Sequence, residues 1–146
     1  MWPQAADILL VEDDPNDAEM ALAALRERNI FREVVHLMDG PDALLYISST
    51  GLFDASQVRL PKVILLDMKL KTVTGLDVLR QLKVEERTRT IPVVMFTSNQ
   101  REIEVIESYH LGVNSYVIKP ADYETYKQVV GDMGHYWLNI NRSPCR

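Results

Sequence analysis

The chain has 146 residues, which is the length of a single domain with one hydrophobic core. Its hydrophobic fraction of 47% and its charged fraction of 25% are those of an ordinary globular protein. Lys and Arg number 16 against 21 Asp and Glu, so the net charge of -5 argues against nucleic acid and against an anionic membrane surface as partners.

The sequence gives no indication of secretion or of a membrane span. A single cysteine, Cys145, excludes an internal disulfide bond and any metal site built from several cysteines. The longest uninterrupted apolar runs fall far short of the ~20 residues that a membrane helix needs. Residues Met1–Gln4 lack the basic start and apolar stretch of a secretory signal. We therefore expect a cytoplasmic protein.

Short apolar runs recur along the chain and predict buried strands. They contain many β-branched residues and little alternation of apolar and polar positions, as strands buried on both faces require. The runs are Ile8–Val11, Val34–Leu37, Val63–Leu66, Val93–Phe96 and Tyr116–Ile118.

Amphipathic segments separate these runs and predict helices. Ala18, Leu22 and Leu25 fall on one helical face, and residues 101–111 and 122–140 also have helical patterns. Strands that alternate with helices form right-handed βαβ units. The predicted fold class is therefore α/β, a doubly wound five-stranded parallel sheet flanked by five helices.

Two aspartates are predicted to cap helices. Asp14 precedes Pro15 at the start of the first helix, and Asp122 leads the last one.

Polar side chains follow four of the five predicted strands. Glu12 and Asp13 end the first strand, Asp67 the third, Thr97 the fourth and Lys119 the fifth. In a doubly wound sheet these ends meet at one edge, where ligands bind. Adjacent carboxylates would repel one another in a partly desolvated cleft, so a hard divalent cation such as Mg²⁺ is the expected neutralising group.

This set of residues predicts phosphoryl transfer. A carboxylate can act as a nucleophile and carry an acyl phosphate, and Asp67 follows the central predicted strand. The cation would bridge Asp67 and one phosphoryl oxygen, while Lys119 and the Thr97 hydroxyl would contact the other two oxygens.

Four motifs resemble the receiver domain of two-component response regulators: ILLVEDDPND, VILLDMKL, VVMFTSN and YVIKP. The resemblance extends from about Ile8 to Leu138 and implies a CheY-like fold, with residues 1–146 forming a single receiver domain. It also implies that Asp67 accepts phosphate from a phosphohistidine on a sensor histidine kinase. Such a domain is a phosphoacceptor, with slow autodephosphorylation at most, rather than an enzyme.

The same resemblance assigns the metal ligands. Besides the acceptor Asp67, Asp13 would bind Mg²⁺ directly, Glu12 would bind it through water, and the backbone carbonyl of Lys69 would be a further ligand. A cis peptide bond would join Lys119 and Pro120.

In this family a phosphorylation switch couples the hydroxyl at Thr97 to the aromatic ring at Tyr116. By resemblance, phosphorylation would shift the face formed by residues 100–138. Few residues follow Lys119, so we expect the output to be a contact with another protein. A homodimer through the last helix and the fifth strand is favoured by that helix's apolar residues, which are Tyr123, Tyr126, Val129, Val130, Met133, Tyr136 and Trp137.

Two further features point to one group within this family. The segment Thr50–Leu60 and the tail His135–Leu138 are similar to those of single-domain regulators paired with bacterial and cyanobacterial phytochromes. They suggest a bacteriophytochrome as the partner kinase.

Several alternatives remain at the level of sequence. A phosphatase with an aspartate nucleophile would need a second Asp where Lys69 stands, and a flavin carrier would need a phosphate-binding loop where Glu12, Asp13 and Asp14 stand. A receiver that docks without phosphorylation is a more serious alternative, but every residue of the acceptor site is present. An intermediate in a phosphorelay also remains open.

Overall fold

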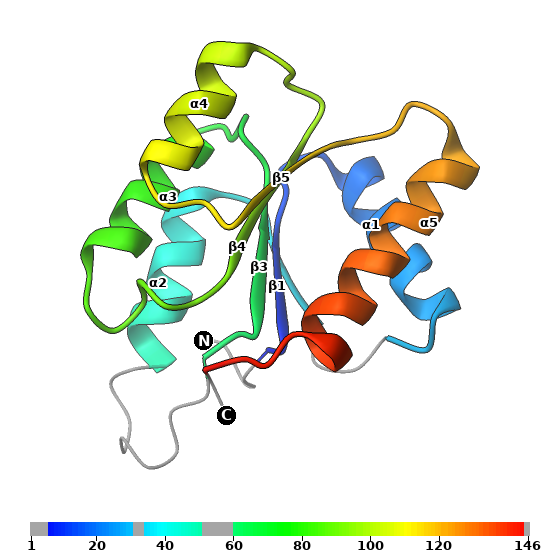
Figure 1. The fold of residues 1–146 in the computed structure, drawn as a ribbon, viewed down its shortest axis with the longest axis horizontal. Coiled ribbons are helices and arrows are strands. Elements are labelled where there is room, and N and C mark those ends of the chain that lie inside the picture. Colours follow the sequence, from blue (N-terminus) through cyan, green and yellow to red (C-terminus); the bar gives the residue numbers. More distant parts are fainter. Residues whose placement is uncertain (1–5, 31–33, 51–59, 145–146) are drawn as a thin grey trace.

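The computed structural model describes residues 6–30, 34–50 and 60–144, with side chains at 48–50 excepted. In this part of the chain, five strands alternate with five α-helices (Figure 1). The strands are β1 (Ile8–Val11), β2 (Val34–Leu37), β3 (Val63–Leu66), β4 (Val93–Thr97) and β5 (Ser115–Ile118). The helices are α1 (Pro15–Glu27), α2 (Gly40–Thr50), α3 (Gly75–Val84), α4 (Glu102–His110) and α5 (Tyr123–His135). Residues 51–59 of the predicted loop and Cys145 lie outside the described residues.

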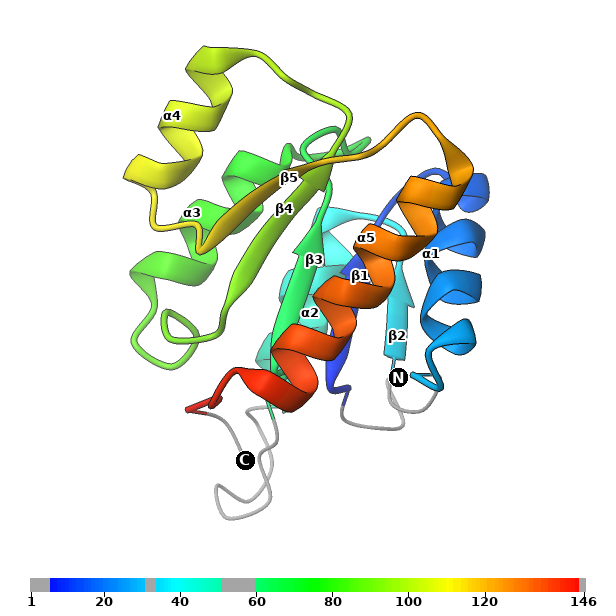
Figure 2. The same ribbon diagram turned by 45° about the vertical axis from the view of Figure 1, so that its right-hand side comes forward.

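The strands form one parallel sheet in the order β2-β1-β3-β4-β5. Helices α1 and α5 cover one face of the sheet, and α2, α3 and α4 cover the other (Figures 1 and 2). The strand order reverses between β1 and β3, which is where doubly wound sheets form their binding crevice. The predicted fold is confirmed.

Burial follows the position of each strand in the sheet. Every residue of β1, β3 and β4 is buried, whereas most of β2 and all of β5, the two edge strands, are partly exposed. Neighbouring residues of one strand enter different apolar clusters, as Leu9 and Leu10 show. This two-sided burial explains why the strands are continuous apolar runs.

Both predicted helix caps are present. The Asp14 carboxylate accepts a hydrogen bond from the Asn16 N–H at 2.8 Å, and Pro15 opens α1. The Asp122 carboxylate accepts from the Thr125 N–H at 2.9 Å at the start of α5. Each side chain satisfies a backbone donor that the first helical turn leaves unpaired.

The last helix differs from its prediction in two respects. It is α-helical only to His135 and continues as a π-helical turn over Tyr136–Ile140. Most of its apolar residues also belong to the core, because Tyr126, Val130 and Met133 are buried against the sheet. Tyr123 and Tyr136 are the exposed members of the set.

No helix among residues 6–30, 34–50 and 60–144 is both long and apolar enough to cross a membrane.

Gly75 brings α3 close to the end of β3. Its N–H donates to the Met68 carbonyl at 2.8 Å. A Cβ atom at this position would lie 2.8 Å from the Met68 Cα and still closer to the Asp67 carbonyl oxygen. Because the obstructing atoms belong to the backbone, a side chain here would displace the turn that carries Asp67.

We expect Gly75→Ala to lower the free energy of unfolding by about 1–3 kcal/mol, the usual cost of overpacking. Urea denaturation followed by circular dichroism measures the change. Gln81→Ala, at an exposed position of the same helix, is the matched control and should stay within about 0.5 kcal/mol of the parent chain. Equal stabilities for the parent chain and Gly75→Ala would contradict this account of the turn.

Candidate functional site

Strand register brings the predicted site residues to one edge of the sheet. Val11 pairs with Leu66, so the residues that follow them in sequence, Glu12 and Asp67, lie side by side. On the other side of β3, Thr97 pairs with Ile118, which Lys119 follows. Parallel strands thus place side chains from distant parts of the sequence together.

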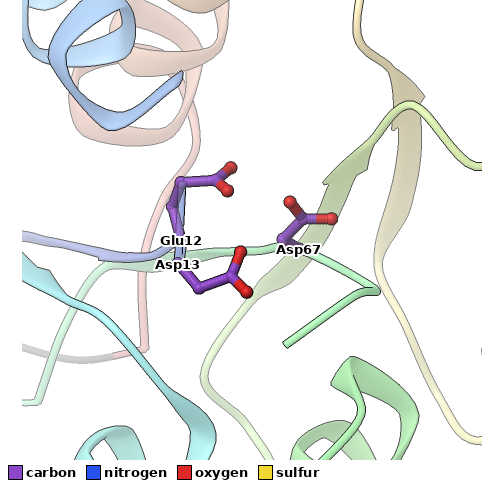
Figure 3. A group of neighbouring side chains, drawn as sticks. All are labelled: Glu12, Asp13 and Asp67. Carbon is purple, nitrogen blue, oxygen red and sulfur yellow. The ribbon is translucent and has the colours of Figure 1, made fainter. Parts of the chain in front are cut away.

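Three carboxylates form a cluster at this edge. Glu12, Asp13 and Asp67 extend from the ends of β1 and β3 toward one another (Figure 3), and each offers an oxygen within 4.8 Å of the other two. Glu12 and Asp67 are buried, and Asp13 is partly exposed. An all-oxygen, negatively charged set of this kind fits a hard divalent cation. These three residues are among the four that the sequence predicted as metal ligands, and Lys69 is the fourth.

The Lys119 ammonium lies among three carboxylates, two of them from this cluster. Its Nζ is 2.6 Å from Glu12 Oε1, 3.0 Å from Asp67 Oδ2 and 2.9 Å from Asp17 Oδ2. The Lys119 side chain is only 7% exposed. Burial opposes its charge, but hydrogen bonds to Glu12 and Asp17 prevail and raise the pKa of Lys119 above its ordinary value. The ammonium therefore stays charged.

Asp17 is a site residue that sequence reasoning missed. It lies in the first turn of α1, where acidic residues are common because they complement the helix dipole. The available signal was its position three residues after the cap Asp14. Residues in the first turn of α1 lie near the end of β1, and therefore near the predicted site.

Asp67, the predicted acceptor, is held from two sides. Its Oδ2 contacts Lys119, and its Oδ1 accepts a hydrogen bond from the Lys69 N–H at 3.3 Å. The Lys69 side chain is exposed, and the role of its carbonyl as a metal ligand stays a prediction.

The two predicted switch residues meet at Asn99 in the loop after β4. The Asn99 N–H donates to Thr97 Oγ1 at 3.2 Å, and the Tyr116 hydroxyl donates to the Asn99 carbonyl at 2.8 Å. Thr97 is buried, and the Tyr116 ring packs against the apolar cluster on the α2–α4 side. The backbone of one residue, Asn99, therefore connects the Thr97 hydroxyl with the Tyr116 hydroxyl.

The predicted cis peptide bond is wrong. The bond between Lys119 and Pro120 is trans, the isomer that X–Pro bonds favour by about 0.5–1 kcal/mol. Lys119 reaches its three carboxylate partners with this trans bond, so the contacts do not require the cis isomer.

The buried carboxyl group of Glu12 has a raised pKa. Burial raises the pKa of Glu12 to about 7 and the nearby Asp67 charge adds to this rise, although the hydrogen bond from Lys119 acts in the opposite direction. A proton on Glu12 near neutral pH would compete with a cation for the same site.

Comparison with known proteins identifies the class. Residues 8–130 match the family described as the response regulator receiver domain. The chain belongs to this family, whose members are signalling domains rather than classical enzymes.

Individual relatives agree in length and fold. The probable methanogenesis regulatory protein FilR2 of Methanothrix harundinacea is 39% identical over 94% of this chain and 86% of its own. The structure of the phosphorylated cyanobacterial phytochrome response regulator RcpA superposes with a TM-score of 0.85 at 30% identity, covering 97% of this chain and 99% of its own. The Mn²⁺-bound response regulator Rcp1, from a Synechocystis strain, has a TM-score of 0.84 at 31% identity over 98% of this chain and all of its own.

We expect divalent-cation affinity to fall as the pH falls through about 7, because Glu12 gains a proton there. Between pH 8 and pH 6 the loss should be about tenfold for a group titrating midway. Isothermal titration calorimetry with MgCl₂ measures it. Glu12→Gln should bind more weakly and with a flatter pH profile, whereas a profile as steep as that of the parent chain would exclude Glu12 as the titrating group.

Proposed function

We propose that the chain acts as a single-domain response regulator that accepts a phosphoryl group on Asp67 in a Mg²⁺-dependent reaction. The observation that carries this proposal is the Lys119 ammonium and the cluster of Glu12, Asp13 and Asp67 at one edge of the sheet. Membership of the receiver family supports it. The phosphorylated state of RcpA is a precedent among similar structures.

The chemistry follows from the position of each group. An Asp67 carboxylate oxygen attacks phosphorus, a P–O bond forms, and the P–N bond to the donor histidine breaks with its electron pair leaving on nitrogen. Lys119 neutralises one phosphoryl oxygen, and the buried Thr97 hydroxyl donates to another. When bound, Mg²⁺ supplies charge neutralisation and orientation of the phosphoryl oxygens, and Glu12, Asp13, Asp67 and the Lys69 carbonyl would hold it.

Two alternative functions, a phosphatase and a flavin-binding electron carrier, fit the site less well. A phosphatase of the aspartate-nucleophile type would need a carboxylate where the exposed Lys69 stands. A flavin carrier would need to hold phosphate beside Glu12 and Asp13, which repel it. A phosphorelay intermediate would use the same acceptor, and a module that docks without phosphorylation would leave the acceptor idle.

The switch would act through the loop after β4. A phosphoryl oxygen that accepts a hydrogen bond from Thr97 would shift the Thr97 hydroxyl, to which the Asn99 N–H donates. The carbonyl of Asn99 accepts a hydrogen bond from the Tyr116 hydroxyl, so the shift would reach Tyr116. Movement of this loop therefore changes the position preferred by the Tyr116 ring, and with it the surface of α4 and β5. Such a switch biases a pre-existing equilibrium by about 1–3 kcal/mol.

The proposed donor is a sensor histidine kinase. Likeness to RcpA, a phytochrome response regulator, and to Rcp1 favours a phytochrome-type kinase such as a bacteriophytochrome. Likeness to FilR2, a probable methanogenesis regulatory protein, is the reason to test kinases of other pathways as well. The decisive measurement is phosphotransfer from a panel of purified, autophosphorylated kinases.

We expect incubation with a small phosphodonor and Mg²⁺ to add one phosphoryl group to the chain, as measured by intact mass. Asp67→Asn should abolish the adduct without unfolding the domain. Asp132→Asn is the matched control and should load normally. It removes an exposed carboxylate of α5 that pairs with Arg28 at the end of α1. An adduct of equal yield on Asp67→Asn would refute the assignment of the acceptor.

A homodimer is the proposed output state, formed through the α4–β5–α5 face. This face consists of the edge strand β5 and the exposed residues Ile103, Ile106, Tyr109 and Tyr123. The three α4 residues are exposed and recur at every third position. Helix α4 itself lies beside β5 (Figures 1 and 2). A two-fold dimer buries the same stripe on both copies.

We expect Ile106→Glu to weaken dimerisation at least tenfold, because the two-fold axis would bring two added charges into one apolar contact. Sedimentation velocity with and without phosphodonor measures the change. Val84→Glu, an equally apolar exposed position at the end of α3, is the control and should leave association unchanged. A dimer that tolerates Ile106→Glu would place the interface elsewhere.

A further inference from the structure

We propose that Asp17 is a positioning residue for Lys119, which it holds beside the acceptor while the cation occupies the other carboxylates. This inference rests on the proposed phosphoacceptor function and names a residue that the function does not otherwise use. It follows from the contacts, the charges and the anchoring of Asp17.

The three partners of the Lys119 ammonium are not equivalent. Glu12 and Asp67 belong to the cluster whose oxygens lie within 4.8 Å of one another, so a bound cation draws on both. Asp17 lies outside that cluster, and its Oδ2 is 2.9 Å from Nζ. Asp17 is therefore the partner of Lys119 for which the cation does not compete.

Electrostatics favours a third partner for Lys119. A divalent cation held at the cluster would repel the ammonium and would weaken its attraction to Glu12 and Asp67. The Phe96 ring lies 5.7 Å from Nζ and offers an apolar surface with a favourable cation–π contact but no negative charge. The Asp17 carboxylate keeps the ammonium in the site at this stage.

Asp17 is anchored independently of the strands that carry the acceptor. Its N–H donates to the Asp14 carboxylate at 3.4 Å within the cap of α1. Its carbonyl accepts from the hydroxyl of Tyr126, a buried residue of α5, at 3.1 Å. A residue fixed by two helices can keep Lys119 in place while the strand ends adjust to a phosphoryl group.

The test is the rate of phosphoryl loading from a small phosphodonor with Mg²⁺, followed by intact mass. Asp17→Asn keeps the size and removes the charge, and should load roughly fivefold more slowly, as expected for a weakened charge-assisted hydrogen bond. Asp17→Glu, which restores the charge, should recover part of the rate. Glu19→Gln makes the same charge change at an exposed site of α1 and should load at the parental rate.

A double-mutant cycle separates positioning from a structural role. If Asp17 acts through Lys119, then Asp17→Asn should cause no further loss in a Lys119→Ala background. Thermal unfolding of each variant confirms that the compared chains are folded. If Asp17→Asn does not fold, Asp17→Glu takes its place in the cycle.

The outcomes are distinguishable. A parent chain that takes up no phosphate overturns the proposed function and this inference together. A parent chain that loads, with Asp17→Asn loading equally fast, overturns the inference alone. An undiminished effect of Asp17→Asn in the Lys119→Ala background also overturns it.

Discussion

The site depends on one buried ammonium that compensates several carboxylates. Lys119 comes from the end of β5, and its partners come from β1, β3 and α1, so the interaction joins four elements at one point. One positive charge cannot balance Glu12, Asp13, Asp17 and Asp67 together. The excess negative charge favours a bound cation, and under the proposed function such a cation would offset the repulsion between these carboxylates and a phosphoryl group.

The parallel sheet is what makes this convergence predictable from sequence. A strand buried on both faces must be an apolar run, so each strand could be located, and the residue after each run had to lie at the same edge. Asp67, Thr97 and Lys119 were found by this reasoning, and Asp13 and Glu12 with them. The caps Asp14 and Asp122 could also be predicted, because capping depends on a local hydrogen bond rather than on distant contacts.

Contacts between distant segments were beyond the same reasoning. Asp17 and Lys119 are far apart in sequence, and an acidic residue in a first helical turn has an ordinary local explanation. The apolar residues of α5 could not be divided between core and surface without knowing which side of α5 meets the sheet. The close approach of Gly75 to the Asp67 backbone is likewise a property of the packed structure. The resemblance also carried over a cis bond at Pro120 that the structure does not contain, because a family's backbone isomer is not encoded in the motif letters alone.

The site edge also connects the two faces of the sheet. On one side, Lys119 bonds to Asp17 in α1, whose carbonyl accepts from Tyr126 in α5. On the other side, Thr97 and Tyr116 both hydrogen-bond to the backbone of Asn99, and Tyr116 packs against the apolar cluster on the α2–α4 side of the sheet. Under the proposed mechanism a phosphoryl group on Asp67 engages Lys119 and Thr97 simultaneously, so it acts on both helical layers in one step. Each connection runs through hydrogen bonds with defined partners. The coupling is therefore set by the difference in free energy between two discrete arrangements of these bonds. A change on one face of the sheet need not pass through the apolar core to reach the other face.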